Sequence, residues 1–386
     1  MPPIALNRRR FLGCSAAASL ALSQGALGEA ADRDAAPVRL GVIGIGNRGT
    51  TLLRSLLELQ GAPIVAVADP EPKRRLRGQG IVEKAQGRRP DAFEDPRRIF
   101  DRNDVDAVVV AVPCDLHESI TSAALKAGKS LYAEKPLALT LAGCDRLARE
   151  AAARPELAVH VGFQRRSNPR FRECIDRIHK GELGTLIEAR STWTSSNGPL
   201  QGHGGWLGRR ERSGDFMVEQ AVHIWDVFHW LHGDVPAKAT GWGRRGLFAR
   251  QDPGRDVTDH YSVELEWADG FRASFVQSWI SPADVGFTGS TLRVLGEEGG
   301  IDLGTGSLTF RDRQRPRQSI HADPQNDTRM ALLDWLASIR AETPLPPPIS
   351  LPEARNATLT GLLVRKAVDE RGAVTRDEIR AEASGV

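Results

Sequence analysis

A glycine-rich turn and a later acid are the residues whose types and spacing most directly indicate chemistry. Gly44, Gly46 and Gly49 have the spacing of a phosphate-binding turn, and Asp69 follows Gly49 by 20 residues. The first glycine permits a tight turn, the second lets the main chain approach a pyrophosphate, and the third lets a helix pack closely on a strand. An acid after the next strand accepts hydrogen bonds from ribose hydroxyls and repels a 2′-phosphate. We expect a dinucleotide site that prefers NAD to NADP, with these cofactor-binding residues: Gly44, Ile45, Gly46, Asn47, Arg48, Gly49 and Asp69.

Three basic residues soon after Asp69 keep the choice of cofactor open. Lys73, Arg74 and Arg75 could neutralise a 2′-phosphate and so admit NADP. A lone glycine motif is also compatible with a flavin site or with a turn that binds nothing. Context favours the dinucleotide, because this turn follows an apolar strand and opens a helix.

The elements around the turn predict a parallel sheet. Apolar runs alternate with segments whose apolar residues follow helical spacing, which indicates a doubly wound α/β sheet. The predicted strands are 38–43, 63–69, 105–112, 130–133 and 157–162, and the predicted helices are 50–59, 115–128 and 140–153. We therefore expect an N-terminal Rossmann domain over residues 37–162.

The following residues predict a second domain, of the α+β class. Strand-like runs occur at 185–194, 257–267, 271–279, 290–295 and 307–310, and a helix is expected over 216–232. Asp269-Gly270 between two of these runs is a strong hairpin signal. We expect an open, largely antiparallel sheet faced by that helix in a substrate-binding domain over 163–345. Helices over 326–340 and 352–371 follow, the latter in a C-terminal helix and tail over 350–386.

Charge and composition exclude some classes of partner. The formal net charge is +3, and Arg8 to Arg10 against Glu29 account for two of these charges. The remaining chain is nearly neutral, so it lacks the basic footprint of a protein that binds nucleic acid. Beyond residue 30 no apolar stretch is long enough to span a membrane.

Residues 1–30 have the pattern of an export signal. The arginines 8–10 precede a short apolar stretch and a zone of small residues, which is typical of a secretory signal peptide and resembles the twin-arginine type. An amphipathic helix and a lipid attachment site at Cys14 are the less favoured alternatives. We expect passage through the twin-arginine translocase to the periplasm, cleavage after Gly28 or Ala30, and no stable membrane anchor.

Three cysteines remain after the signal: Cys114, Cys144 and Cys174. Their number is odd and their spacing is too wide for a zinc site or a disulfide framework. We expect them to be thiols in the core.

Four further motifs, in order along the chain, resemble the Gfo/Idh/MocA family of oxidoreductases, whose members include glucose–fructose oxidoreductase and inositol dehydrogenases. The motifs are Ala-Val-Pro-Cys-Asp-Leu-His at 111–117, Glu134-Lys135-Pro136, Val-Gly-Phe-Gln-Arg-Arg at 161–166, and the helix with Glu219 and His223. The resemblance implies a Rossmann domain followed by a domain whose open sheet carries the substrate site and joins subunits into a homo-oligomer.

The resemblance also implies roles for residues at the carboxyl edge of the parallel sheet. Pro113 and His117 would lie along the cofactor, with a simple helix-capping turn as the alternative. Glu134 would face the nicotinamide ribose. Lys135 would contact both cofactor and substrate, because a cation there favours the alkoxide that forms on a sugar hydroxyl as hydride leaves; a surface lysine is the alternative.

Glu219 and His223 are the remaining catalytic candidates. With Asp226 and Trp230 they share one face of a helix over 216–232. His223 would be the general base, because imidazole titrates near neutral pH. The family usually has aspartate where this chain has Glu219, so whether Glu219 orients His223 or binds a hydroxyl stays open. Glu-x3-His is also half of a metal site, but no third ligand is evident and we expect no metal.

Aromatic, amide and hydroxyl groups gather between Trp193 and Trp206 in the sequence. Aromatic faces with polar partners suit the apolar faces and polar rims of a carbohydrate, although an ordinary surface loop is the competing interpretation. The substrate-binding candidates are Arg165, Trp193, Trp206 and Gln220, and Arg166 and Asn168 are further candidates.

These features together predict an exported NAD-dependent oxidoreductase acting on a secondary hydroxyl of a sugar or polyol. Free nicotinamide cofactor is not expected outside the cytoplasm, so the enzyme would keep its NAD bound and restore its redox state in each cycle. Ping-pong transfer between two sugars would do this. The alternative is an NAD-dependent glycoside hydrolase that works by transient oxidation, elimination and re-reduction, and a third hypothesis is a non-catalytic sugar-binding protein.

Overall fold

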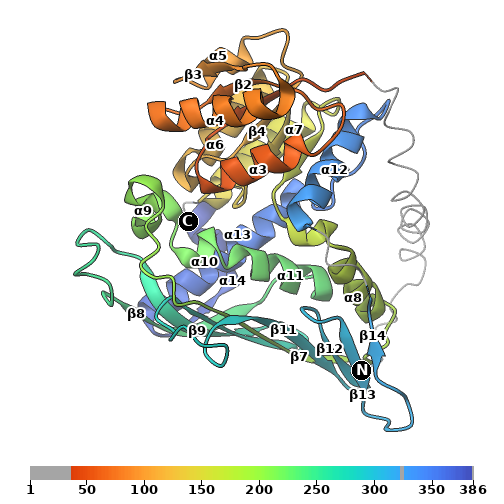
Figure 1. Cartoon of the computed structure of the whole chain (residues 1–386). Coiled ribbons are helices and arrows are strands. Elements are labelled where there is room, and N and C mark those ends of the chain that lie inside the picture. The colour runs from red at the N-terminus through yellow and green to blue at the C-terminus, as the bar shows by residue number, and fades with distance from the viewer. Residues whose placement is uncertain (1–35, 322–325, 385–386) are drawn as a thin grey trace.

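The computed structural model describes residues 36–321 and 326–384 and contains two β-sheets with helices around them (Figure 1). The predicted signal peptide over 1–30 lies outside these residues. One sheet and its helices form one end of the molecule, a long curved sheet forms the other, and helices α10, α11 and α13 lie between the two (Figure 1). Within the described ranges, no helix is both long and apolar enough to cross a bilayer.

Six parallel strands form the first sheet, in the order β3-β2-β1-β4-β5-β6. The strands are β1 (Leu40–Ile43), β2 (Ile64–Ala68), β3 (Asp91–Phe93), β4 (Ala107–Val110), β5 (Ser130–Ala133) and β6 (Val159–Val161). The helices are α3 (Asn47–Leu57), α4 (Pro72–Gln86), α5 (Arg97–Phe100), α6 (His117–Lys126) and α7 (Leu141–Ala152). The predicted doubly wound Rossmann sheet is confirmed, and its strand order reverses between β1 and β4, where such sheets bind ligands.

Three elements of this domain were not predicted: α4, β3 and the short helix α5. Helix α4 buries only Gly78 and Val82, so it has no apolar stripe for periodicity to reveal. Strand β3 has three residues, none of them buried, and it lies at the sheet edge.

Nine strands form the second sheet, in the order β14-β13-β12-β11-β7-β10-β9-β8-β15. They are β7 (Leu186–Thr194), β8 (Lys238–Arg245), β9 (Thr258–Glu266), β10 (Arg272–Ser278), β11 (Gly289–Gly296), β12 (Gly299–Asp302), β13 (Ser307–Phe310), β14 (Gln318–Ser319) and β15 (Ala373–Thr375). All neighbours pair antiparallel except β10 with β7. The prediction of an open, largely antiparallel sheet is therefore confirmed.

Strand β8 was missed because its sequence carries glycines in place of the usual apolar residues. A Cβ added at Gly241 or Gly243 would come within 2.8 or 2.6 Å of the Val368 side chain. Glycine here therefore admits the close approach of helix α13 (Leu351–Glu370) to the strand.

The helix expected over 216–232 is interrupted, so that prediction was wrong in one respect. Helix α10 (Phe216–Glu219) ends before α11 (Val222–His232) begins. The main-chain N–H groups of Gln220 and Ala221 both donate to the Phe216 carbonyl, at 3.0 and 2.8 Å, which breaks the regular ladder. Gln220 and Ala221 therefore lie at the break between the two helices.

The C-terminal helices connect the two ends of the molecule. Helix α12 (Asp327–Arg340) packs in the Rossmann core, where the Trp335 ring lies 5.9 Å from that of Tyr132 and its Nε1 donates to the Ala158 carbonyl at 3.2 Å. The predicted segment 163–345 thus gives one helix to the other domain. Helix α13 contacts α7 of the Rossmann domain as well as α11 and β8 of the second domain, so it packs between the two. Helices α8 (Pro169–His179), α9 (Arg210–Ser213) and α14 (Arg376–Ser384) complete the fold.

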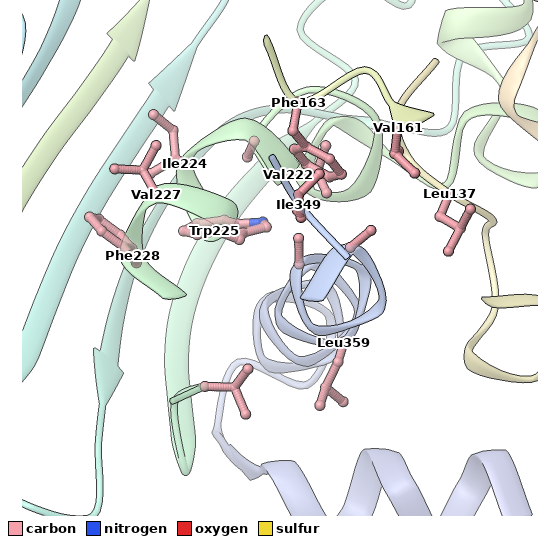
Figure 2. Packing of buried hydrophobic residues seen from close by; sticks show 14 of the residues in the cluster. Leu137, Val161, Phe163, Val222, Ile224, Trp225, Val227, Phe228, Ile349 and Leu359 are labelled. Carbon is pink, nitrogen blue, oxygen red and sulfur yellow. The ribbon is translucent and has the colours of Figure 1, made fainter. Parts of the chain in front are cut away.

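The larger hydrophobic cluster runs through the junction of the two domains. Figure 2 shows Phe163 next to Val222 of α11 with Ile349 close by, and Val161 and Leu137 of the same cluster further to the right. Because this core is shared, the carboxyl edge of the Rossmann sheet is held against α10 and α11.

Candidate active site

The glycine turn has the geometry that its sequence predicts. Gly44 has φ +86°, and a Cβ added at Gly49 would lie 1.8 Å from the Gly44 carbonyl oxygen. Gly46 is the N-cap of α3, and the first turn of that helix carries no acidic residue. Main-chain N–H groups at a helix N-terminus without a nearby acid can bind phosphate, so these residues fit a dinucleotide.

Asp69 lies directly after β2, and its carboxylate supports the turn. Its Oδ2 accepts from the Ile45 N–H at 2.8 Å and its Oδ1 accepts from the Glu71 N–H at 2.9 Å, with the residue only 3% exposed. Arg74 lies 3.8 Å from Oδ1. A carboxylate can accept about four hydrogen bonds, so these contacts leave capacity for a ribose hydroxyl.

Arg48 of the turn crosses to the strand end that carries Glu134. Its Nε donates to Glu134 Oε1 at 2.6 Å and its Nη1 donates to Thr328 Oγ1 at 2.8 Å. The main-chain N–H of Lys135 donates to Glu134 Oε2 at 3.2 Å. Glu134 therefore joins the cofactor turn to the loop that places Lys135.

Lys135 and Glu219 form the central pair of the site. The Lys135 ammonium donates to Glu219 Oε1 at 2.8 Å and to the Glu219 carbonyl at 2.6 Å, and the two side chains are 12% and 15% exposed. Burial would lower the pKa of Lys135, but the charges of Glu219 and Glu134 and the hydrogen bond to Glu219 together raise the pKa above its ordinary value. Lys135 is therefore a positioned cation.

His223 lies in a buried position beside these charges. Its ring is 6.1 Å from that of Phe163 and 6.3 Å from that of Trp193. Burial, with the positive charges of Lys135 and Arg165, lowers the pKa of His223 well below its ordinary value. The imidazole is consequently neutral at pH 7 and can accept a proton.

Trp193 and Arg165 meet next to His223. The Arg165 guanidinium lies 5.3 Å from the centre of the Trp193 ring, and burial lowers the pKa of Arg165 to about 10. Its Nη1 is buried without a hydrogen-bond partner among the residues that the structure describes. Both residues were substrate-binding candidates, and the structure brings them together with the candidate base.

Gln220 lies at the α10–α11 break, one residue after Glu219. Its Oε1 accepts from the Nε2 of Gln277 on β10, and Gln277 Oε1 in turn accepts from the Tyr261 hydroxyl on β9. Sequence reasoning missed Gln277 and Tyr261. The sequence indicated them only weakly, because a polar residue on the buried face of a strand shows up only as an interruption of the alternation between apolar and polar residues.

Two comparisons of sequence place this chain among known proteins. Residues 38–163 match the oxidoreductase family with an NAD-binding Rossmann fold, and residues 171–302 match the GFO/IDH/MocA C-terminal domain. Inositol 2-dehydrogenase 1 of Saccharopolyspora erythraea is 32% identical over 294 residues, which are 74% of this chain and 80% of that protein. The chain belongs to the Gfo/Idh/MocA family.

Other relatives agree with this membership. Myo-inositol 2-dehydrogenase of Thermotoga maritima is 25% identical over 360 residues, 89% of this chain and 99% of that protein. The crystal structure of scyllo-inositol dehydrogenase from Lactobacillus casei, with bound NAD(H) and scyllo-inositol, has a TM-score of 0.72. It is 18% identical and covers 88% of this chain and 99% of that one. At this identity the structural match shows the shared Gfo/Idh/MocA fold.

The glutamate that replaces the usual family aspartate has an observed role. Glu219 reaches Lys135 and makes no hydrogen bond to His223, whose Nδ1 is buried without a partner in the described part of the chain. The expectation that Glu219 orients His223 is therefore not supported. The additional methylene extends its carboxylate across the domain junction to the lysine.

His117 does not have the place expected of a cofactor ligand. One ring nitrogen lies 2.6 Å from the Pro136 carbonyl and the other 2.9 Å from the Val112 carbonyl, and the residue is 2% exposed. With both nitrogens on main-chain carbonyls, the ring connects the end of β4 to the loop after Lys135. Pro113, the N-cap of the short helix η2 (Cys114–Leu116), lies at the same strand end.

Three other candidates are not brought into this cluster. Arg166 forms a buried ion pair with Asp226 at 2.8 Å, and Asn168 caps α8 by accepting from the Phe171 N–H. Trp206 lies in helix η4 (His203–Gly208), and no polar or ring contact given by the structure joins it to Lys135 or His223. Arg166 and Asn168 therefore serve the fold.

The three cysteines in the described ranges are free and buried, in line with core thiols. Within those ranges no group of three or more His, Cys, Asp or Glu side chains is placed to hold a metal ion.

Proposed function

We propose that this chain is an NAD-dependent oxidoreductase that oxidises a secondary hydroxyl of a sugar or polyol. The observation that carries the proposal is the Lys135 ammonium, fixed by Glu219 at the carboxyl edge of the Rossmann sheet with neutral His223 nearby. The inositol dehydrogenases among its relatives support this substrate class.

NAD, when bound, would supply the acceptor for the hydride. The chain's own residues do the remaining work. Lys135 donates a hydrogen bond to the reacting hydroxyl oxygen and stabilises the negative charge that develops on it. His223 is the general base that takes the hydroxyl proton.

Asp69 supports a preference for NAD over NADP. Its buried carboxylate lies where an adenosine ribose would bind, and a 2′-phosphate there would be repelled. Arg74 lies 3.8 Å from this carboxylate, and its positive charge would reduce the preference by attracting a 2′-phosphate. Steady-state kinetics with each cofactor test the proposal, and a lower KM for NADP⁺ than for NAD⁺ would contradict it.

The decisive assay is NADH formation with a panel of inositols, aldoses and aldonates. We expect turnover with at least one secondary alcohol and none with primary alcohols alone. The non-catalytic alternative predicts binding without turnover across the whole panel.

The Lys135–Glu219 pair favours simple oxidation over the glycoside hydrolase alternative. If Glu219 assisted the elimination, its carboxyl group would have to donate a proton to the leaving oxygen, whereas in the structure its Oε1 accepts from the Lys135 ammonium. A chromogenic glycoside panel separates the two. Release of the chromophore without net NADH would establish the alternative.

Export to the periplasm with a bound, recycled cofactor is part of the proposal. It is supported by the twin-arginine pattern of residues 8–10 and by a cofactor turn that is joined through Arg48 to Glu134 and Thr328. Cell fractionation tests the compartment. Denaturing the purified protein should release about one dinucleotide per chain, and a protein that folds without any would refute recycling.

A homo-oligomer through the second sheet is also proposed. On the face away from α11, Trp242 and Leu295 are 50% and 44% exposed, among charged side chains. Light scattering should show an oligomer that Trp242→Glu weakens, whereas a monomeric wild type would contradict it.

A further inference from the structure

A polar row crosses the second sheet beneath the candidate site. Gln277 of β10 pairs with Trp193 of β7 on one side and with Tyr261 of β9 on the other. Directly paired residues of neighbouring strands point to the same face of a sheet. Because the Trp193 ring lies 6.3 Å from that of His223, this is the face that lies under the site.

The row ends in Gln220. The Tyr261 hydroxyl donates to Gln277 Oε1, and Gln277 Nε2 donates to Gln220 Oε1 at 2.5 Å. Tyr261 and Gln277 are each 1% exposed, so water does not compete for these bonds. Gln220 itself is partly exposed.

The direction of these hydrogen bonds follows from what Tyr261 can do. Burial raises the pKa of Tyr261 well above its ordinary value, so the phenol keeps its hydrogen. If both amides were reversed, Tyr261 would accept from Gln277, and its own hydrogen would point into a dry interior without the acceptor it now has. A buried donor left without a partner is strongly disfavoured, because it has lost its hydrogen bond to water without gaining another.

In the favoured direction, the orientation of each side-chain amide fixes the orientation of the next one. Gln277 uses its carbonyl for Tyr261 and its N–H for Gln220. Gln220 uses its carbonyl for Gln277, which leaves its own Nε2 as the free end. That end is not among the buried polar atoms without a partner, so its N–H groups face accessible space.

The main chain of Gln220 is connected to the groups of the reaction. Gln220 directly follows Glu219, whose carbonyl and carboxylate both hold Lys135, and His223 donates its main-chain N–H to the Gln220 carbonyl at 3.2 Å. Gln220 lies at the break between α10 and α11, and its side chain reaches Gln277 of the sheet.

We propose that Gln220 is a specificity-determining residue that donates a hydrogen bond to an oxygen on a carbon next to the one oxidised, and that Gln277 and Tyr261 are its positioning residues. The inference rests on the proposed oxidation of a sugar or polyol and narrows its substrates to vicinal diols or polyols. A site built to pair with a polar group rejects analogues that lack it far more strongly than an apolar pocket does.

The test measures discrimination between a polyol and its analogues that lack one hydroxyl. The probes are myo-inositol and D-glucose, each with its monodeoxy analogues and the matching mono-O-methyl ethers, assayed by NADH formation. For the better parent, the wild type should show one analogue whose kcat/KM is at least about 100-fold lower. The O-methyl ether at that position keeps an oxygen that can accept a hydrogen bond, so its kcat/KM should fall less than that of the deoxy analogue.

The discrimination ratio is kcat/KM for the parent divided by kcat/KM for that deoxy analogue. Gln220→Leu should reduce this ratio about tenfold or more, because KM for the parent rises while kcat/KM for the deoxy analogue is nearly unchanged. A net hydrogen bond of about 1.4 kcal/mol corresponds to that factor. Tyr261→Phe removes one remote hydroxyl and should reduce the ratio about threefold with kcat nearly unchanged. Gln318→Leu, at the far end of the sheet, is the matched control and should change nothing.

The outcomes separate the two proposals. A wild type without turnover on any probe would overturn the proposed function, and this inference with it. An active wild type whose ratios persist in Gln220→Leu would overturn the inference alone. A ratio lost in Gln220→Leu but unchanged in Tyr261→Phe would overturn the positioning role of the row.

Discussion

At the scale of single residues, the site depends on how one carboxylate and one ammonium are paired. Glu219 reaches Lys135 from another domain, so the charge that stabilises an alkoxide is held in place before the substrate binds. Burial, together with nearby cations, lowers the pKa of His223 and keeps its ring a neutral proton acceptor. Lys135 therefore stays protonated while His223 stays unprotonated, as an oxyanion-stabilising cation and a general base require.

Lys135→Met should abolish most turnover while NAD stays bound, because the cofactor turn does not depend on the ammonium. We expect kcat to fall by about 10²–10³, the usual cost of removing one group that stabilises an oxyanion. Glu219→Gln keeps the shape and the main-chain carbonyl contact, so its loss should be smaller. Full activity in Lys135→Met, measured as NADH formation at saturating substrate, would remove this residue from the mechanism.

The pH dependence of kcat/KM should show that the pKa of His223 is lowered. A base whose pKa lies below 6.5 is still deprotonated when an ordinary histidine is half protonated. The kcat/KM for oxidation should therefore persist as the pH falls through 6.5 and be lost only at lower pH. An acid limb centred at 6.5 or above would exclude His223, in its observed environment, as the base.

At the scale of elements, the turn between β1 and α3 is where glycine is indispensable. Because the Gly44 carbonyl lies against Gly49, no side chain can be added without moving main chain. Gly49→Ala should therefore lose bound dinucleotide and lower the denaturation midpoint. Gly80→Ala in exposed α4 is the matched control: nothing lies within 4 Å of its Cβ, and alanine should stabilise that helix by about 0.5–1 kcal/mol. If Gly49→Ala kept its dinucleotide, the turn would not be the phosphate site.

At the scale of the whole molecule, one buried ion pair joins the segment after the Rossmann sheet to the helices of the second domain. Arg166 and Asp226 have side chains 4% and 1% exposed, and Arg166 also lies 3.3 Å from Glu353 of α13. Asp226→Asn removes the closer of the two carboxylates from the buried arginine, and breaking a buried pair in this way costs up to about 3–5 kcal/mol. Arg272→Gln breaks an exposed pair on the outer sheet, where a loss below about 1 kcal/mol is expected. Urea denaturation measures both, and equal effects would show that the junction is not stabilised by this pair.

Much of the fold and part of the site follow from the sequence, because they depend on local patterns. Alternating apolar runs predict the parallel sheet, and the Gly44 to Gly49 spacing predicts its turn. Strand β8 and helix α4 could not be predicted, since glycines in the strand and charged residues in the helix leave no regular apolar pattern.

The sequence by itself determined which residues could do the chemistry: a glycine turn, a lysine after a buried strand, and a histidine on a helix. Only the tertiary structure decided their partners. Glu219 contacts a residue 84 positions away, His117 turned out to support a loop, and Gln277 and Tyr261 come under Gln220 from two other strands. The physical reason is that periodicity reports which side of an element is buried, whereas a hydrogen-bond partner is chosen by how distant elements pack.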